Sequence, residues 1–158
     1  METIKKERFK VRKLIDIDFY GGYLNVLKDG FQLDPSSITL EDFRLFLMKQ
    51  QGITFVIEDT NKSKGYGCTN YIVASASIFI EQKLIHNLGK VGHIEDIVVS
   101  SEYRGYGLGK LIVNTCIDYA KNQGCYKCIL DCSTENIGFY QKCNKDFQIK
   151  GVELAIYY

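Results

Sequence analysis

The segment HIEDIVVSSEYRGYGLGKLIVNTCIDYAKNQG, residues 93–124, joins a strand pattern to a helix pattern through a loop rich in glycine. The loop contains three glycines and is flanked by two basic residues: Gly105, Gly107, Gly109, Arg104 and Lys110. Glycines let backbone N–H groups approach a ligand without side chains in the way. The helix over 110–124 places its positive end at this loop. The segment therefore predicts an anion site suited to a phosphate or a pyrophosphate.

The spacing of these glycines differs from that of the common nucleotide-binding motifs. They form GxGxG rather than GxGxxG, and Leu111 follows Lys110 where the Walker pattern requires Ser or Thr. The loop also lies two-thirds along the chain, whereas the dinucleotide-binding fold carries its loop at the N-terminus. A turn that is glycine-rich for steric reasons alone stays open as the alternative.

Strand and helix patterns alternate on both sides of this segment. The expected strands are 9–15, 53–59, 68–83, 90–100, 125–133 and 151–158, the expected helices are 16–29, 39–50, 110–124 and 134–143, and 61–67 and 84–89 are a turn and a loop. Thr39 and Asp42 predict a capping box, and Gly52 and Gly124 end their helices. This order predicts a mixed α/β layer fold.

Composition excludes several classes of protein. The chain has 158 residues, of which 46% are hydrophobic and 25% charged, as expected for a single domain over 1–158. A net charge of +1 argues against a nucleic-acid binder. The longest apolar stretch, 71–80, is about half as long as the ~20 residues of a membrane span. The N-terminus lacks the apolar core of a signal peptide, so we expect a cytoplasmic protein that binds no nucleic acid and no membrane.

The chain contains six cysteines: Cys68, Cys116, Cys125, Cys128, Cys132 and Cys143. Free thiols are the better interpretation in a chain of this length without a secretory signal. Cys125 and Cys128 form one CxxC motif, but a structural zinc site usually needs two such pairs. We therefore expect no metal.

Two adjacent carboxylates, Glu95 and Asp96, lie in the strand before the glycine loop. Neighbours on a strand point to opposite faces, so one of them should face the buried side of the sheet. A half-buried carboxylate beside an anion site is a candidate base or amine ligand. Two solvated acids at a strand edge are the alternative.

The loop resembles that of the GNAT acetyltransferases, Gln/Arg-x-x-Gly-x-Gly/Ala, at Arg104, Gly107 and Gly109. A narrower resemblance to the glucosamine 6-phosphate N-acetyltransferases is carried by four segments: GHIEDIVV (92–99), RGYGLGKLIV (104–113), GCYKCILDC (124–132) and NIGFYQKC (136–143). The resemblance implies the GNAT fold, with a mixed, mostly antiparallel central sheet flanked by helices. It also implies a homodimer with the C-terminal strand at its interface. The implied reaction acetylates glucosamine 6-phosphate from acetyl-CoA in a ternary complex, in UDP-N-acetylglucosamine biosynthesis.

The resemblance implies a donor site in which the pyrophosphate lies on the glycine loop. The pantetheine arm would pair with the preceding strand as an added strand does, and a backbone N–H near Ile97 or Val98 would stabilise the oxyanion. The implied acetyl-CoA contacts are Ile97, Val98, Val99, Arg104, Gly105, Tyr106, Gly107, Leu108, Gly109, Lys110, Asn136 and Tyr140.

The resemblance also assigns catalytic roles. Tyr140 would face the leaving thiolate, which is feasible because the reference pKa values of a tyrosine and a thiol are about 10 and about 8.5. Its alternative is one more core aromatic. Glu95, Asp96 or a water that they hold would take the ammonium proton, and Asp131 would position the amine or tune Tyr140. An acetyl-cysteine route is disfavoured, since no histidine lies near the thiols in sequence.

The implied acceptor contacts are Lys28, Lys83, Leu84, Ile85, His86, Glu95, Asp96, Ile97, Tyr126, Lys127 and Tyr157. The lysines would supply charge to a phosphate, and a solvated surface lysine is the alternative for each. His93 is expected to be a hydrogen-bonded structural histidine. Tyr157 stands where the resembling proteins carry a basic residue that reaches across the dimer interface toward the phosphate, and the chain after Cys143 lacks their Gly-Phe.

Two other functions stay open. The first is acetylation of another small amine, although a basic cluster at Lys83, Tyr126 and Lys127 suits a phosphorylated acceptor and repels a polycation. The second is a non-catalytic domain that binds acyl-CoA, which would need neither Tyr140 nor the carboxylate pair.

Overall fold

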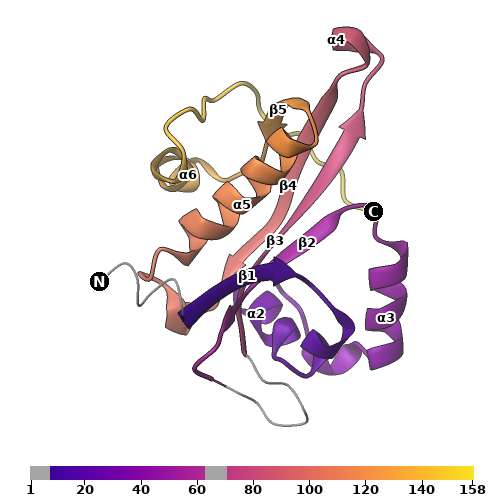
Figure 1. Ribbon diagram of the computed structural model, residues 1–158, viewed down its shortest axis with the longest axis vertical. Helices are drawn as coiled ribbons and strands as arrows, with labels where there is room; N and C mark the ends of the chain where they lie inside the picture. Colours follow the sequence, from indigo (N-terminus) through magenta and orange to yellow (C-terminus); the bar gives the residue numbers. More distant parts are fainter. Residues whose placement is uncertain (1–7, 63–70) are drawn as a thin grey trace.

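The computed structural model describes residues 8–62 and 71–158. In this part of the chain five strands form one sheet in the order β1-β2-β3-β4-β5: β1 Phe9–Lys13, β2 Ile53–Asp59, β3 Tyr71–Gln82, β4 Lys90–Val99 and β5 Cys125–Ile129 (Figure 1). Neighbouring strands are antiparallel from β1 to β4, whereas β4 and β5 are parallel. This confirms the mixed, mostly antiparallel sheet that we expected.

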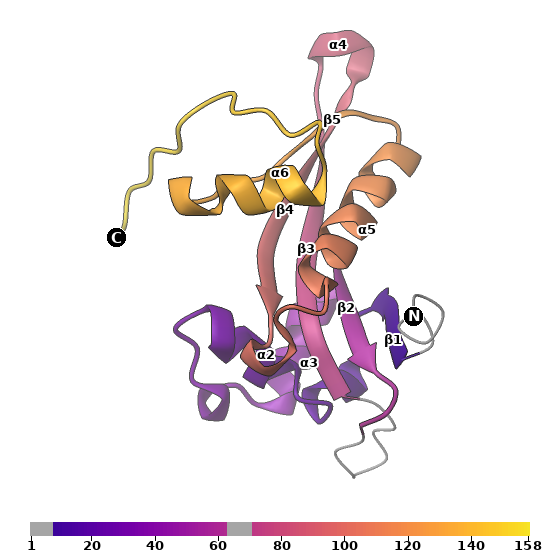
Figure 2. The same cartoon turned by 90° about the vertical axis from the view of Figure 1, so that its left-hand side faces the viewer.

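Helices cover both faces of the sheet. They are α2 Tyr23–Gly30, α3 Leu40–Lys49, α5 Leu108–Asn122 and α6 Ile137–Cys143, with 3-10 turns η1 Asp16–Phe19, η2 Pro35–Ser37, η3 Ser101–Tyr103 and η4 Thr134–Asn136. Figure 2 shows α5 on one side of the strands, with α2 and α3 on the other. The short segment α4, Ile85–Leu88, lies at the tip of the long β3–β4 hairpin.

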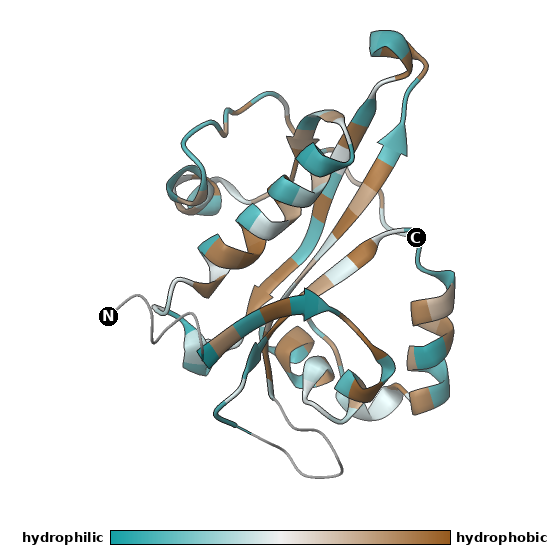
Figure 3. Cartoon of the chain, viewed as in Figure 1, coloured by the Kyte–Doolittle hydropathy of each residue, from teal (hydrophilic) through white to brown (hydrophobic). Residues whose placement is uncertain are grey.

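Two hydrophobic cores follow from this layering. The first lies between the sheet and α5, where Ile78, Ile94 and Ile112 are almost fully buried. The second lies under α2 and α3, where Phe43 and Val56 pack. Strand β3 is buried on both faces from residue 72 to 78, and the central strands are in large part hydrophobic (Figure 3).

Local signals place two helix starts. Thr39 and Asp42 form the expected capping box, since the Asp42 amide donates to Thr39 Oγ1 at 3.1 Å and the Thr39 amide to Asp42 Oδ2 at 3.0 Å. The helix expected over 16–29 is instead divided into η1 and α2. Gly22 causes this break, because it caps α2 with a left-handed φ of 89° that other residues rarely adopt.

The strand expected over 151–158 is wrong. This segment is exposed along its length, and its apolar side chains have no place in either core: Val152, Leu154 and Ile156 are 91%, 94% and 79% exposed. It leaves the domain on the side of the sheet away from α5 (Figure 2). The alternation is real, but a strand needs a neighbouring strand, and the described part of the chain pairs none with it.

Two other expected elements differ in extent. The strand over 125–133 ends at Ile129 as β5. Much of the turn at 61–67, the start of the strand at 68–83 and Cys68 lie outside the described residues. Over the ranges that are described, no helix combines the length and the apolar character of a membrane span.

Candidate active site

The two parallel strands, β4 and β5, separate partway along β4. Strand β5 pairs with β4 only from Lys90 to His93, whereas β3 stays paired with β4 as far as Val99. Residues 94–99 therefore have a strand neighbour on one edge only, among the residues described. The other edge offers backbone donors and acceptors to an extended ligand. The predicted donor contacts Ile97, Val98 and Val99 lie here, and Val98 can contribute only its backbone because its side chain is 5% exposed.

A β-bulge interrupts β4 at the predicted carboxylate pair. The register with β3 shifts between Ser75 and Ser77, and Asp96 has a φ of 51°. The bulge breaks the alternation of side chains. Glu95 and Asp96 are consequently both exposed, so the expectation that one of them faces the buried side is wrong.

Three predicted catalytic carboxylates, Glu95, Asp96 and Asp131, lie close enough for their charges to interact. Partial burial raises the pKa of Glu95, and the charges of Asp131 and Asp96 raise this pKa further. Glu153 of the C-terminal segment acts in the same direction, and His93 opposes it. A carboxylate with a raised pKa is a better proton acceptor near neutral pH than an ordinary glutamate.

The glycine loop follows β4 and η3 directly. Gly105 and Gly107 have φ angles of 85° and 80°, and a Cβ on either residue would meet no atom within 4 Å. Helix α5 then begins, and its first helical hydrogen bond runs from the Leu111 amide to the Gly107 carbonyl at 3.1 Å. The amides of residues 108–110 precede that bond, so they have no acceptor within the helix. Leu108 is 3% exposed and can offer only its backbone.

The side chains of the loop lie at the surface, and Tyr106 also packs against neighbouring residues. The Tyr106 ring packs edge-on against Phe9 with centroids 5.7 Å apart, and it lies under the Arg8 guanidinium at 5.6 Å. Arg104 and Lys110 are exposed at the two ends of the glycine run. The loop thus keeps two exposed cations beside its backbone amides.

Helix α6 packs directly on the start of α5. A Cβ on Gly109 would lie 2.7 Å from Cζ of Phe139, so a larger residue here would displace the end of that ring. Tyr140 is half-buried beside Phe139, with ring centroids 5.0 Å apart. Burial raises the pKa of Tyr140, and Cys132 and Cys143 add to the effect. Tyr140 is therefore a core aromatic in part, and its hydroxyl is held protonated.

The remaining donor contact, Asn136, is exposed directly before α6. Its side-chain amide donates to Ser133 Oγ at 3.1 Å. This hydrogen bond fixes the side chain at the start of the helix that carries Tyr140.

The β3–β4 hairpin and β5 bring several predicted acceptor residues together. His86 and Tyr126 stack with ring centroids 4.2 Å apart, and Lys127 Nζ lies 5.8 Å from the Tyr126 ring centre. Lys83 forms an ion pair with Glu81, so its charge is partly neutralised. Leu84 and Ile85 are exposed at the hairpin tip.

His93 is the structural histidine that we expected. Its Nε2 lies 2.9 Å from Glu81 Oε2, the same carboxylate that pairs with Lys83. This contact confirms the prediction and links the acceptor side of the hairpin to β4.

Two predicted acceptor residues stand apart from this group. Lys28 is exposed near the end of α2. Tyr157 is 93% exposed on the C-terminal segment and does not reach the site within one chain.

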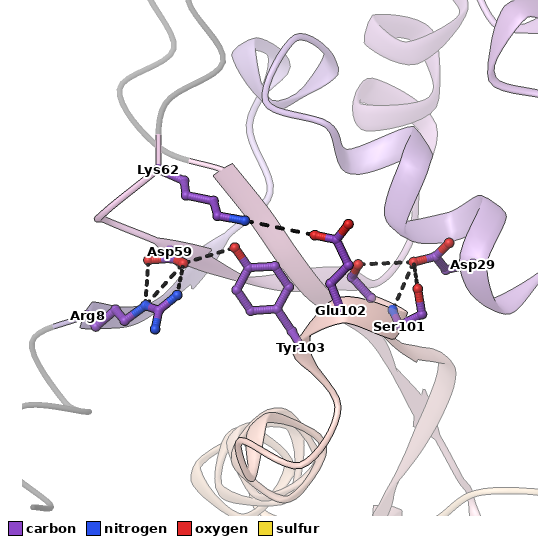
Figure 4. A network of polar contacts seen from close by, with 8 residues as sticks. Arg8, Asp29, Asp59, Lys62, Ser101, Glu102 and Tyr103 are labelled. Carbon is purple, nitrogen blue, oxygen red and sulfur yellow. Dashed lines mark hydrogen bonds and ion pairs between the residues drawn. The ribbon is translucent and has the colours of Figure 1, made fainter.

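Sequence reasoning missed the residues that hold the glycine loop. Asp29 binds Ser100 and Ser101, and Asp59 accepts a hydrogen bond from the Tyr103 hydroxyl at 3.0 Å (Figure 4). These partners lie 71, 72 and 44 residues apart in sequence, and no local pattern reveals such contacts.

The described cysteines are free and poor nucleophiles. Burial raises the pKa of Cys116 to about 12 and that of Cys128 to about 11, which keeps both thiols protonated. The pKa of the exposed Cys132 is raised as well, by burial and by Asp131. Within residues 8–62 and 71–158 no group of three or more His, Cys, Asp or Glu side chains could hold a metal ion.

Comparison with known proteins gives one consistent result. Residues 22–144 match the model of the acetyltransferase (GNAT) family. Glucosamine 6-phosphate N-acetyltransferase of Arabidopsis thaliana is 42% identical over 151 residues, which cover 90% of this chain and 95% of the relative. Glucosamine 6-phosphate N-acetyltransferase 1 of Dictyostelium discoideum is 40% identical, over 99% and 96% of the two chains. The crystal structure of the Arabidopsis thaliana enzyme superposes with a TM-score of 0.80 at 39% identity, over 95% of this chain and 98% of that one.

Proposed function

The chain belongs to the GNAT acetyltransferases, among the glucosamine 6-phosphate N-acetyltransferases, and on this basis we propose that it acetylates the amine of glucosamine 6-phosphate. The acetyl donor is acetyl-CoA, and the products are N-acetylglucosamine 6-phosphate and CoA. One observation carries the proposal: the unpaired edge of β4 leads straight into a glycine turn and the start of α5, beside a group of carboxylates.

The donor site divides into two parts along the chain. The pantetheine arm lies along residues 97–99 of β4 and pairs with their backbone as an extra strand would. The pyrophosphate lies on Gly105 and Gly107, where the free amides of α5 and the charges of Arg104 and Lys110 favour an anion. Glycine is needed here because a side chain would fill the open space that the pyrophosphate takes.

The reaction begins with deprotonation of the acceptor. The ammonium group of the sugar loses its proton to Glu95, to Asp96 or to a water that they hold, and the raised pKa of Glu95 suits this role. The free amine then attacks the carbonyl carbon of the thioester and forms the new C–N bond. A backbone N–H near Ile97 or Val98 stabilises the oxyanion, an effect often worth about 3 kcal/mol.

The intermediate collapses with cleavage of the C–S bond. Tyr140 donates a proton or a hydrogen bond to the departing thiolate, and its protonated hydroxyl fits that role. The charge of Asp131 raises the pKa of Glu95, and Asp131 would help to position the amine. The protonated cysteines at positions 116 and 128 argue for direct attack rather than an acetyl-cysteine intermediate.

The sugar phosphate binds near the tip of the β3–β4 hairpin, where β5 begins beside it. Tyr126 and His86 offer a stacked aromatic surface, and Lys127 supplies a charge above it. Lys83 is a weaker phosphate ligand than the sequence indicates while Glu81 pairs with it. Lys28, the other cation predicted for the acceptor, lies on α2 and apart from this group, so it is not a phosphate ligand here within one chain.

The C-terminal segment, residues 151–158, supports a homodimer. A row of exposed apolar side chains on an extended segment is unfavourable in water, and pairing with the sheet of a second copy would bury it. If each copy pairs its C-terminal segment with the sheet of the other, Tyr157 would also move toward the site of the other copy. Light scattering should give twice the mass of 18.1 kDa, and deletion of residues 151–158 should give a monomer.

The decisive experiment measures thiol release from acetyl-CoA with glucosamine 6-phosphate, glucosamine, spermidine and lysine as acceptors. Thiol release with glucosamine 6-phosphate, and with none of the other three amines, supports the proposal. Release with another amine and not with the sugar phosphate would assign a different acceptor. Tight binding of acetyl-CoA without release for any amine would indicate a non-catalytic domain. The cytoplasmic location expected from the sequence stays a prediction, which cell fractionation tests.

A further inference from the structure

Asp29 makes an unusual set of contacts at the end of α2. Its Oδ2 atom accepts three hydrogen bonds, from Ser100 Oγ at 3.0 Å, from the Ser101 amide at 2.9 Å and from Ser101 Oγ at 3.2 Å (Figure 4). Both serines lie where β4 ends and η3 begins. One carboxylate oxygen therefore holds the point at which the chain turns out of the sheet toward the glycine loop.

The negative charge of Asp29 would by itself weaken the binding of a phosphate at the neighbouring glycine loop. The hydrogen bond from the Ser101 amide lowers the pKa of Asp29, and the serine hydroxyls and the charge of Arg104 lower it further, so the group is ionised at neutral pH. Arg104 belongs to the proposed pyrophosphate site. A fixed negative charge in this position opposes the binding of a phosphate. If Asp29 favours ligand binding, it must do so through its hydrogen bonds to Ser100 and Ser101 and not through its charge.

Asp29 is itself fixed relative to β4. Helix α2 packs on the end of this strand so closely that a Cβ on the next residue, Gly30, would lie 2.6 Å from Cγ2 of Val98. Val98 belongs to the strand segment that we assign to the pantetheine arm. The contact between α2 and β4 gives Asp29 a stable base from which to orient the turn.

A second carboxylate holds the other end of η3. The Tyr103 hydroxyl donates to Asp59 Oδ2 at 3.0 Å, and Asp59 is fully buried in an ion pair with Arg8 at 2.7 Å. Arg104 and Gly105 follow Tyr103 directly. The short turn before the glycine loop is thus fixed at Ser101 by Asp29 and at Tyr103 by Asp59.

We propose that Asp29 is a positioning residue for the acetyl donor: it sets the orientation of the glycine turn relative to the free edge of β4. This inference rests on the proposed function, since it requires one ligand that spans both. A ligand with two arms gains affinity when both arms fit at once, and it loses that gain when the two parts of the site move apart.

The charge of Asp29 and its hydrogen bonds should affect CoA binding in opposite directions, so variants that remove one or both can test the proposal. Asp29→Ala removes the charge and all three hydrogen bonds, whereas Asp29→Asn removes the charge and keeps an acceptor oxygen. Glu102→Gln is the matched control. Glu102 lies on the same turn, its side chain is 74% exposed, and its ion-pair contact with Lys62 is long, at 3.9 Å.

Calorimetry with CoA and steady-state kinetics with acetyl-CoA give the readout. We expect Asp29→Ala to raise the Kd of CoA and the KM of acetyl-CoA about tenfold, as for the loss of hydrogen bonds to a charged group. The kcat at saturation and the KM of the sugar phosphate should stay within about twofold. Asp29→Asn should fall between Asp29→Ala and the wild type, and Glu102→Gln should bind CoA at least as tightly as the wild type.

S-acetylpantetheine separates positioning from a general structural role. This shorter donor has no pyrophosphate, so it contacts β4 and not the glycine turn. Asp29→Ala should lower kcat/KM for acetyl-CoA about tenfold and leave kcat/KM for S-acetylpantetheine unchanged. Equal losses with both donors would show that Asp29 merely stabilises the protein, and the proposal would be overturned.

Two further outcomes would also overturn it. Tighter CoA binding by Asp29→Ala, Asp29→Asn and Glu102→Gln alike would show that only the charge matters. Unchanged binding in Asp29→Ala would show that Asp59 alone holds the turn. If Asp29→Ala does not fold, Ser101→Ala removes one of the three bonds and should show a smaller change in the same direction. A wild-type protein that binds no CoA refutes the proposed function itself, independently of any Asp29 variant.

Discussion

Replacement of Gly107 by valine tests the pyrophosphate site directly. Gly107 has a φ of 80°, and a Cβ there would meet no atom within 4 Å. The side chain would therefore fit in the free protein but would occupy the space in front of the α5 amides. The left-handed backbone should cost valine about 1–2 kcal/mol of folding free energy. That loss corresponds to a decrease in Tm of about 2–8 °C for a protein of this size.

The expected loss of affinity is much larger than the loss of stability. Two hydrogen bonds from backbone amides to a phosphate amount to about 3 kcal/mol or more. Their loss raises the Kd of acetyl-CoA by about a hundredfold or more. Calorimetry at a temperature well below the lowered Tm separates the two effects.

Gly124→Val is the matched control for Gly107→Val. Gly124 also has a left-handed φ, 76°, and a Cβ there would also meet no atom within 4 Å. It lies at the opposite end of α5, about 25 Å from Gly107 along the helix axis. Both variants should lose similar stability, and only Gly107→Val should lose acetyl-CoA binding. Equal affinity in the two variants would show that the loop is a steric turn and no anion site.

Three other predictions concern catalysis and stability. Tyr140→Phe should lower kcat about tenfold or more with little change in the Kd of acetyl-CoA, because only the proton donor to the thiolate is lost; an unchanged kcat would remove Tyr140 from the mechanism. The pH profile of kcat/KM should have an acidic limb above the ordinary glutamate pKa of 4.5, because the raised pKa of Glu95 keeps this base protonated to higher pH. Glu95→Gln should abolish that limb. A limb that persists in this variant would assign the base to another group. Tyr103→Phe should lower the free energy of unfolding by about 1.5–3 kcal/mol in urea titrations, because the fully buried Asp59 loses a donor, and an unchanged value would show that Arg8 and the Asn61 amide satisfy this carboxylate without it.

The centre of the fold was accessible from the sequence because its signals are local. The segment 93–124 carries a strand pattern, glycines and an amphipathic helix in direct succession, and the structure has β4, the turn and α5 in that order. The capping box at Thr39 is equally local. The four residues from Thr39 to Asp42 suffice to recognise it.

Features that depend on several elements could not be predicted in this way. The bulge at Asp96 reverses the side-chain alternation that any strand prediction assumes, and it arises from the pairing of β4 with β3. The anchors Asp29 and Asp59 lie on other elements than the turn that they hold. Residues 151–158 show the converse, since their alternation predicts a strand but cannot supply the partner that a strand needs.

The separation of β4 from β5 links the lifetime of the protein in the cell to the supply of its own substrate. Without a ligand, residues 94–99 of β4 have no strand neighbour along one edge among the described residues, and local opening should start there. A ligand at a hundred times its Kd adds about 2.7 kcal/mol to the stability of the folded state. Proteases that attack transiently opened chains respond to that difference, so cells short of coenzyme A should degrade this protein faster than cells with ample coenzyme A.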